Sequence, residues 1–157
     1  MSKKSPRTKE EQRHYNMSRI SSNNTTIETH FRKALWHEGI RYRKNDKRLP
    51  GKPDIAITKY RIAVFCDGEF WHGKDWKVKK DKIQNNRDYW IEKIERNMTR
   101  DNEIDKRLHS MGWIVLRFWG SEIKKELPLC VLEVKDAILQ AQIDSCDAPE
   151  KIDHIGE

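Results

Sequence analysis

The sequence is poor in cysteine and has no long apolar run. Its three cysteines, Cys66, Cys130 and Cys146, are odd in number, lie far apart and form no CxxC or CxxH pair. That spacing argues against a disulfide framework and a zinc finger, and indicates reduced thiols in a cytosol. The sequence lacks the run of about 18 apolar residues that a membrane span needs, and no apolar stretch follows the basic N-terminus as in a signal peptide. We therefore expect a cytoplasmic protein.

Charged residues, in contrast, are abundant and predominantly basic. The 157 residues include 32 lysines and arginines against 25 aspartates and glutamates, a net charge of +7. This balance favours an anionic partner such as nucleic acid, through phosphate contacts and counterion release. A solvated surface that only keeps the protein soluble is the alternative. The length suits one compact domain, so a catalytic site must be built from a single fold.

The apolar pattern predicts one domain between two polar ends. Residues 1–15 are expected to form a flexible basic arm, residues 16–143 the domain, and residues 144–157 a flexible tail. Within the domain, the order of elements indicates an α/β or α+β fold around a mixed sheet. The predicted elements are an amphipathic helix over 25–39, antiparallel strands over 54–58 and 61–66, a long helix over 91–111, a strand over 113–119, and a last helix that begins near Pro128.

An acidic residue follows a proline-stiffened turn at the start of the first predicted strand. This residue, Asp54, ends the run Leu-Pro-Gly-Lys-Pro-Asp at 49–54. A carboxylate held rigidly there suits a hard cation such as Mg2+, which prefers oxygen ligands. If the hairpin turns near Tyr60, paired residue numbers sum to about 120, which places Asp54 opposite Cys66 or its neighbour. For an isolated Pro-Asp, a residue that only ends a turn would be the better explanation.

The segment 66–73 adds acids, an imidazole and two aromatic side chains at the other end of the hairpin. Within it, His72 could accept a proton from an attacking water, since an ordinary histidine pKa of about 6.5 suits a general base near neutrality. A lone histidine is more often a surface or packing residue, so this assignment depends on the neighbours of His72.

Asp101 is one such neighbour, because it falls on the apolar stripe of the long predicted helix. A carboxylate on a buried stripe needs a partner. It could orient His72, or it could form a structural salt bridge with Arg100 or Lys93. Asn97, one helical turn earlier on the same side, could support the same network.

Glu28 lies in the first turn of the first predicted helix and has two explanations. It could bind metal-bound water or orient a base in the site. It could instead close a capping box with Thr25, because the run Thr-Thr-Ile-Glu at 25–28 matches that pattern.

Large aromatic side chains beside polar residues are candidates for contact with bases. Phe70, Trp71 and Trp90 could wedge between base pairs, which costs roughly a few kcal/mol per unstacked step and less at a mismatch. Core packing is the alternative, and it is the better explanation for Trp113 and Trp119 on an apolar strand. The basic residues nearby indicate either a phosphate-tracking stretch or a solvated loop. They are Lys74, Lys77, Lys79, Lys80, Lys82 and Arg87.

Several of these segments, in this order, resemble the very-short-patch repair (Vsr) endonucleases. The resemblance spans roughly residues 16–119. It implies a single domain with a restriction-endonuclease-like fold, an α/β mixed sheet flanked by helices. The segments are Asn-Met-Ser-Arg-Ile at 16–20, Ile-Glu at 27–28, the run at 49–54, Phe-Cys-Asp-Gly-Glu-Phe-Trp-His at 65–72, Tyr-Trp-Ile-Glu-Lys-Ile at 89–94, Asn97, Arg-Asp at 100–101 and Gly-Trp at 112–113.

The resemblance assigns a role to each catalytic candidate. It implies that Asp54 is a metal ligand and that the backbone carbonyl of Cys66 completes the protein's share of the shell around Mg2+, with one or two ions bound. It further implies that His72 is the general base and that Asp101 hydrogen-bonds to it and orients it. Glu28 would assist at the metal-water shell.

The resemblance also implies how DNA is bound. An aromatic wedge would enter at the mismatch, while the N-terminal arm would embrace the duplex from the other groove. The implied DNA-binding residues are Phe70, Trp71, Trp90, Met17, Arg19, Lys52 and Asn97.

On this basis we expect a strand-specific, Mg2+-dependent endonuclease that nicks double-stranded DNA next to a T:G mismatch and leaves a 5'-phosphate. Its task would be to start very-short-patch repair of deaminated 5-methylcytosine. It would work in a bacterial cytoplasm, associated with the nucleoid, alongside a cytosine-5 DNA methyltransferase and downstream repair proteins. The alternatives are a restriction or homing-type nuclease of the same fold, which would cut matched DNA, and a non-catalytic mismatch-binding module.

One departure from a restriction-type site concerns the residues after Glu69. That pattern would have a lysine two places on, but Trp71 stands there, which favours a mechanism centred on His72. Asp67 and Glu69 stay open as further metal ligands.

A second departure concerns zinc, because well-known family members carry a structural zinc near the equivalent of residues 70–72. Here Glu69 and Ser121 stand where cysteines are expected, and residues 73–76 lack the expected histidine and cysteine. Since such a site needs about four Cys or His ligands, we expect no zinc. The loop over 73–86 must then be fixed by packing of Trp76 and Val78, or by ion pairs of Asp75 or Asp81 with nearby lysines.

Overall fold

Four strands form one mixed sheet in the part of the chain that the computed structural model describes, residues 8–12 and 25–147. The strand order is β1-β2-β3-β4. Strand β2 runs antiparallel to β1 and β3, whereas β3 and β4 are parallel. The strands are β1 (Arg43–Lys44), β2 (Ile55–Ile57), β3 (Ile62–Asp67) and β4 (Ile114–Trp119).

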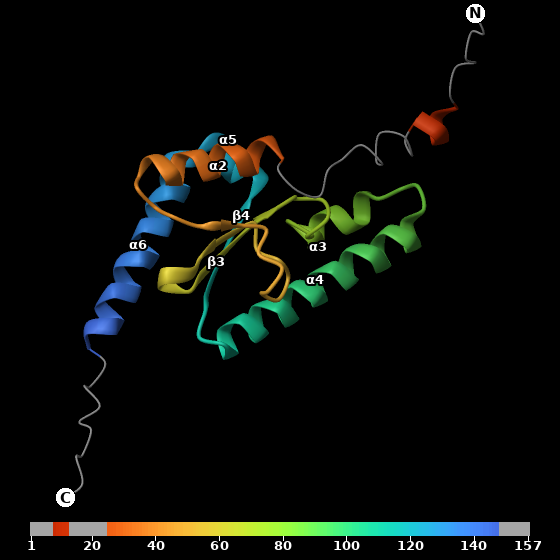
Figure 1. Cartoon of the computed structure of the whole chain (residues 1–157). Coiled ribbons are helices and arrows are strands. Elements are labelled where there is room, and N and C mark those ends of the chain that lie inside the picture. The colour runs from red at the N-terminus through yellow and green to blue at the C-terminus, as the bar shows by residue number, and fades with distance from the viewer. Residues whose placement is uncertain (1–7, 13–24, 148–157) are drawn as a thin grey trace, which may run out of the picture.

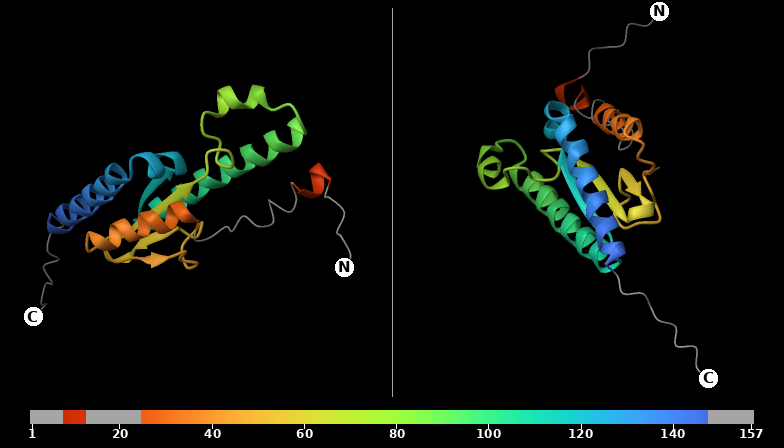
Figure 2. Two further views of the ribbon diagram at one scale, coloured as in Figure 1. Left: turned by 90° about the horizontal axis from the view of Figure 1, so that it is seen from above. Right: turned by 90° about the vertical axis from the view of Figure 1, so that its left-hand side faces the viewer.

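Helices cover both faces of this sheet (Figure 1 and Figure 2). Helices α2, α5 and α6 contact one another on one face, and the long helix α4 packs against β4 on the other face. The expected fold, a mixed sheet flanked by helices in one domain, is confirmed. The helices are α2 (Thr26–His37), α3 (Trp76–Lys79), η2 (Lys80–Lys82), α4 (Arg87–Ser110), α5 (Gly120–Lys125) and α6 (Leu127–Cys146).

Alternation along β3 gives the sheet a core on each face. Ile62 and Val64 join a buried cluster with residues of α2, α5 and α6. Ala63 and Phe65 join a smaller cluster with Leu108 of α4. Because side chains alternate along a strand, Asp67 belongs to the second series and lies on the α4 side. None of the described helices is both long enough and apolar enough to cross a membrane.

The predicted helix signals are confirmed at both ends of the domain. Thr25 caps α2, because its hydroxyl accepts a hydrogen bond from the backbone N–H of Glu28. Pro128 lies in the first turn of α6, where a missing N–H costs nothing. Helix α6 continues to Cys146, so the first three residues assigned to the tail are helical.

The hairpin register is also close to the prediction. Ile55 pairs with Val64 and Ile57 with Ile62, so paired numbers sum to 119 rather than about 120. The connection is a 3-10 turn over Thr58–Tyr60, followed by Arg61 in the left-handed region with φ of 52°. The four residues of the connection, 58–61, are centred between Lys59 and Tyr60 rather than on Tyr60, which gives the sum of 119.

The short elements β1, α3 and α5 are among those that were not predicted. Strand β1 has two residues and both are exposed, so it shows no apolar alternation. Helices α3 and α5 have four and six residues. Elements this short contain less than two helical turns and leave no readable periodicity.

Candidate active site

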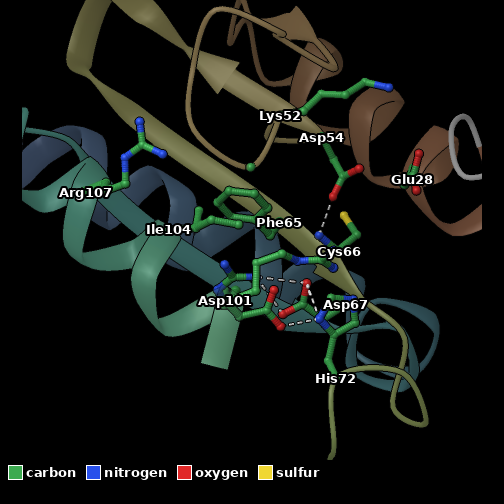
Figure 3. A pocket seen from close by; sticks show the side chains of 13 residues that line it. Glu28, Lys52, Asp54, Phe65, Cys66, Asp67, His72, Asp101, Ile104 and Arg107 are labelled. Carbon is green, nitrogen blue, oxygen red and sulfur yellow. Dashed lines mark hydrogen bonds and ion pairs between the residues drawn. The ribbon is translucent and has the colours of Figure 1, made fainter. Parts of the chain in front are cut away.

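A cavity of about 740 Å3 opens between the β2–β3 hairpin and α4 (Figure 3). It brings together almost every catalytic candidate named from the sequence. The acidic side chains in its lining are Glu28, Asp54, Asp67 and Asp101, and the basic ones are Lys52, Arg100, Arg107 and Arg117, with His72 beside them.

Asp54 is tied to the neighbouring strand, as the hairpin register requires. The backbone N–H of Cys66 donates a hydrogen bond of 2.7 Å to Asp54 Oδ2. The guanidinium of Arg32 donates to the backbone carbonyl of Asp54 at 2.9 Å. Burial of the carboxyl raises the pKa of Asp54 to about 6, against an ordinary value of 3.8, and the nearby charge of Glu28 adds to this rise. Because the charged form of Asp54 is costly in this buried position, a bound cation would stabilise it.

Burial also decides which group of Cys66 can serve as a ligand. Desolvation raises the pKa of the Cys66 thiol, and the negative charge of Asp54 acts in the same direction. The thiol therefore stays protonated at neutral pH. A hard cation prefers oxygen, so the backbone carbonyl of Cys66 is the better donor.

Glu28 is buried and points into the cavity. It is 4% exposed, its Oε2 atom has no hydrogen-bond partner among the described residues, and Arg32 Nη2 lies 3.6 Å from that oxygen. In the described part of the chain, the Thr25 hydroxyl accepts a hydrogen bond only from the backbone N–H of Glu28. Helix capping therefore does not explain the position of the Glu28 carboxylate. A buried oxygen that has one long ion pair and no hydrogen bond, beside a second carboxylate, fits a hard cation or its bound water.

His72 and Asp101 form a close pair at the opposite end of the cavity (Figure 3). His72 Nδ1 lies 2.5 Å from Asp101 Oδ2, so Asp101 pairs with the histidine rather than with Arg100 or Lys93. Burial would lower the pKa of His72. The hydrogen bond to Asp101 and the charges of Asp67 and Asp101 outweigh that effect, and the pKa is raised above 6.5.

Asn97 acts on the loop that carries this histidine. Its Nδ2 atom donates to the backbone carbonyl of Trp71 at 3.1 Å. The N–H of His72 donates to the carbonyl of Gly68 at 3.1 Å, which closes a turn. Asn97 therefore contacts the backbone next to His72, and its support of the His72–Asp101 network stays a prediction.

A group that sequence reasoning missed surrounds Asp67. Arg117 lies between Asp67 and Asp105 and bonds to both carboxylates. The sequence contained one sign of this group. Arg117 is the single charged residue in the otherwise apolar run at 113–119, and a charge in such a run needs a partner. Asp67, His72 and Asp101 offer ligand atoms within 4.8 Å of one another. The guanidinium already bound to both Asp67 oxygens disfavours a second cation at that place.

The aromatic candidates form one partly exposed cluster. Phe70 and Trp71 have ring centroids 5.3 Å apart, and Trp90 lies 5.5 and 5.7 Å from them. Phe70 is 44% exposed, so it is not a core residue. Tyr89, not singled out from the sequence, joins at 5.1 Å from Trp90 and is 57% exposed, while Lys93 Nζ lies over the rings of Trp71, Trp90 and Tyr89.

Glu69, Lys74 and Ser121 fix the start of the following loop. The backbone N–H of Ser121 donates to Glu69 Oε1 at 2.5 Å, and Lys74 Nζ donates to Ser121 Oγ at 3.1 Å. The hydrogen bond to Ser121 holds the pKa of Glu69 below its ordinary value. Two positions where cysteines were expected are thus joined by a polar contact, and Glu69 already has a protein partner.

The other contacts expected for this loop are borne out only in part. Trp76 is anchored, since its Nε1 donates to Glu95 at 3.1 Å. The expected packing of Val78 is wrong, because that side chain is 61% exposed. Asp81 forms an ion pair at 3.4 Å, but its partner is Arg87 rather than a lysine.

Lys52 also lines the cavity, from a tight turn. Gly51 has φ of +73°, and a Cβ there would meet Ile104 at 2.6 Å. Lys52 itself takes the left-handed region with φ of 52°. Strain of this kind is retained where the surroundings fix it, and here the turn holds Asp54 at the cavity. Met17 and Arg19 cannot be placed, since they lie outside the described residues.

Comparison with known proteins gives a consistent result. The family model described as DNA mismatch endonuclease Vsr matches residues 7–78. The type II nicking enzyme V.NmeDIP of Neisseria meningitidis serogroup C is 48% identical over 84% of this chain and 89% of its own length. The type II nicking enzyme V.HpaIIP of Haemophilus parainfluenzae is 47% identical over 83% and 93%. DNA mismatch endonuclease Vsr of Escherichia coli strain K12 is 36% identical over 69% of each chain.

Proposed function

This chain belongs to the Vsr family of DNA mismatch endonucleases and is a DNA endonuclease, and we propose that it nicks one strand of double-stranded DNA next to a T:G mismatch. One observation carries this proposal. The His72–Asp101 pair and the carboxylates of Asp54 and Glu28 line the same cavity, with basic side chains on its α4 wall. A base, oxygen ligands and phosphate-binding cations are the parts that hydrolysis of a phosphodiester needs.

His72 is the proposed general base. Asp101 accepts the hydrogen bond from Nδ1–H, which fixes the tautomer and leaves Nε2 as the proton acceptor. The proton of an attacking water goes to Nε2 as the water oxygen approaches phosphorus. The negative charge of Asp101 stabilises the imidazolium that forms, and it does not itself take the proton.

The donor set at the other end of the cavity fits a divalent ion. Asp54 and the backbone carbonyl of Cys66 would hold Mg2+, as one or two ions, with Glu28 at the water shell. Bound ions would supply charge stabilisation on the phosphate and on the leaving oxygen. Arg100, Arg107 and Lys52 would hold the DNA backbone around the scissile phosphate. As the resemblance to the Vsr family implies, the nick would leave a 5'-phosphate.

The aromatic cluster is the proposed mismatch reader. Phe70, Trp71 and Trp90 would enter the stack where a T:G pair makes unstacking less costly. This substrate would link the enzyme to the bacterial nucleoid and to a cytosine-5 DNA methyltransferase, whose deaminated product is a T:G mismatch, and downstream repair proteins would complete the patch.

A nicking assay on matched and T:G duplexes, with and without Mg2+, tests the proposal. We expect Mg2+-dependent nicking of one strand, much faster on T:G. Equal cleavage of matched DNA would instead support a restriction-type nuclease, and binding without cleavage a non-catalytic module. In the same assay Asp101→Asn should nick more slowly, and Asp136→Asn is its control, because Asp136 is an exposed residue of α6 that does not line the cavity.

A further inference from the structure

Arg117 of β4 is held on both edges and on one face. Its Nη1 donates to Asp67 Oδ1 at 3.1 Å and Oδ2 at 3.0 Å. Its Nε and Nη2 donate to Asp105 Oδ1 at 2.9 and 2.6 Å. The guanidinium also lies over the ring of Phe65, 4.1 Å from the centroid. We call Arg117, Asp67 and Asp105 the arginine clamp, which ties β3, β4 and α4 together.

The clamp lies directly beside the catalytic histidine. Asp67 Oδ1 is 3.8 Å from His72 Nδ1, the same atom that lies 2.5 Å from Asp101 Oδ2. Two carboxylates therefore face a single N–H group. Asp67 is only 6% exposed, so water can do little to stabilise its charge. A buried carboxylate without a cation is costly, and it takes the nearest available donor.

We propose that Arg117 is a positioning residue that reserves His72 for Asp101 by holding both oxygens of Asp67. The inference rests on the proposed role of His72 as the general base. With Arg117 in place, Asp67 has two charge-assisted hydrogen bonds and no need of the imidazole. Without Arg117, Asp67 competes for Nδ1, and the ring turns away from the orientation that Asp101 fixes.

Direct contact of Arg117 with the scissile phosphate is the less suitable explanation. Both edges of the guanidinium are engaged by carboxylates and its face is packed against Phe65. Arg100 and Arg107 also line the cavity and form no such clamp among the described residues. They are better placed to meet DNA, so Arg117 acts through Asp67 and His72.

A charge-removal cycle tests this role. Arg117→Met should lower the single-turnover nicking rate about 100-fold, in the range of a lost orienting contact, while the Kd for DNA changes less than about threefold. Adding Asp67→Asn to Arg117→Met removes the competing carboxylate and should restore the rate to within about tenfold of wild type. Because the orphaned Asp67 charge would also destabilise the fold, and Asp67→Asn would relieve that as well, thermal melting is measured beside the rate. The nicking rates are compared at a temperature where every variant is folded, so a purely structural loss would leave them unchanged.

Asp105→Asn is the matched control. It breaks the other arm of the clamp but leaves Arg117 on Asp67, so the nicking rate should fall by no more than about tenfold, much less than in Arg117→Met, even if the protein melts at a lower temperature. Wild-type nicking by Arg117→Met, or a double variant as slow as Arg117→Met, would overturn the proposal. If Arg117→Met does not fold, the rate of the folded double variant decides in the same way.

The same experiment separates this inference from the proposed function. The wild-type protein is assayed first on matched and T:G duplexes, and the cycle is run on whichever duplex it cleaves. Loss of T:G preference would refute the proposed substrate but leave the cycle valid. A His72→Ala variant with full activity would refute the general base, whereas a failed rescue beside an inactive His72→Ala would refute the role of Arg117 alone.

Discussion

Asp54→Asn should make the metal-free protein more stable while it abolishes nicking. The pKa of Asp54 is raised to about 6 from 3.8, chiefly because the carboxyl is buried. Since each pKa unit corresponds to 1.36 kcal/mol, keeping Asp54 charged at pH 7 costs the folded state about 3 kcal/mol. Asparagine removes this cost and can still accept the hydrogen bond from the Cys66 N–H. Its own amide is also partly desolvated, so about 3 kcal/mol is an upper limit.

Urea unfolding in EDTA measures this difference. At pH 7 the midpoint of Asp54→Asn should lie about 1–2 M above that of the wild type, given typical m-values. The folded state binds the Asp54 proton more tightly than the unfolded state does. The wild type therefore gains stability as the pH falls through 6 toward 3.8, and the gap between the two proteins should narrow.

Added Mg2+ gives the second half of this test. A ligand that binds only the folded state stabilises it by mass action, so Mg2+ should raise the midpoint of the wild type and not that of Asp54→Asn. A variant that is less stable than the wild type in EDTA, or a gap that widens toward acid pH, would refute the assignment of Asp54 as a charged ligand kept at the expense of stability.

The remaining predictions concern the base, the wedge and the loop. His72→Ala should slow nicking by roughly two to four orders of magnitude; Asp101→Asn, which removes the contact that raises the pKa of His72, should move the acid limb of the pH–rate profile to lower pH, and an unmoved limb would exclude His72 as the base. Trp71→Ala should weaken discrimination between T:G and matched duplexes more than total binding, as measured by Kd on both; equal losses would return Trp71 to a packing role. Glu69→Ala should lower the free energy of unfolding by about 1 kcal/mol, since the Ser121 N–H loses its acceptor. In a buffer free of Mg2+, exhaustive chelation should leave thermal melting unchanged, because no structural zinc is expected, and stoichiometric zinc on elemental analysis would contradict this.

The sequence alone predicted those contacts that depend on residues close together in the chain. The antiparallel hairpin brought Asp54 to Cys66 because a short turn leaves few registers. The spacing of Asp101 on α4 placed it on the inward stripe, and the only question was which partner it met. The structure answers with His72.

The arginine clamp could not be predicted from the sequence, and the reason is physical. It depends on the parallel pairing of β3 with β4, which aligns Phe65 with Arg117 across some fifty residues of intervening chain. No local pattern encodes such a register. The direction of Glu28 was ambiguous for another reason, because its backbone N–H satisfies the cap while its side chain turns to the cavity.

Helix α4 has a consequence for how the length of this protein can vary. It carries Trp90 near its start and Asp101 about three turns later, without a break between them. Adding or removing one residue within that stretch would rotate everything beyond it by roughly 100° and displace it by about 1.5 Å. The aromatic cluster and the His72 partner could then no longer face their targets together. Substitutions between these residues can be absorbed one at a time, whereas insertions and deletions within this stretch cannot.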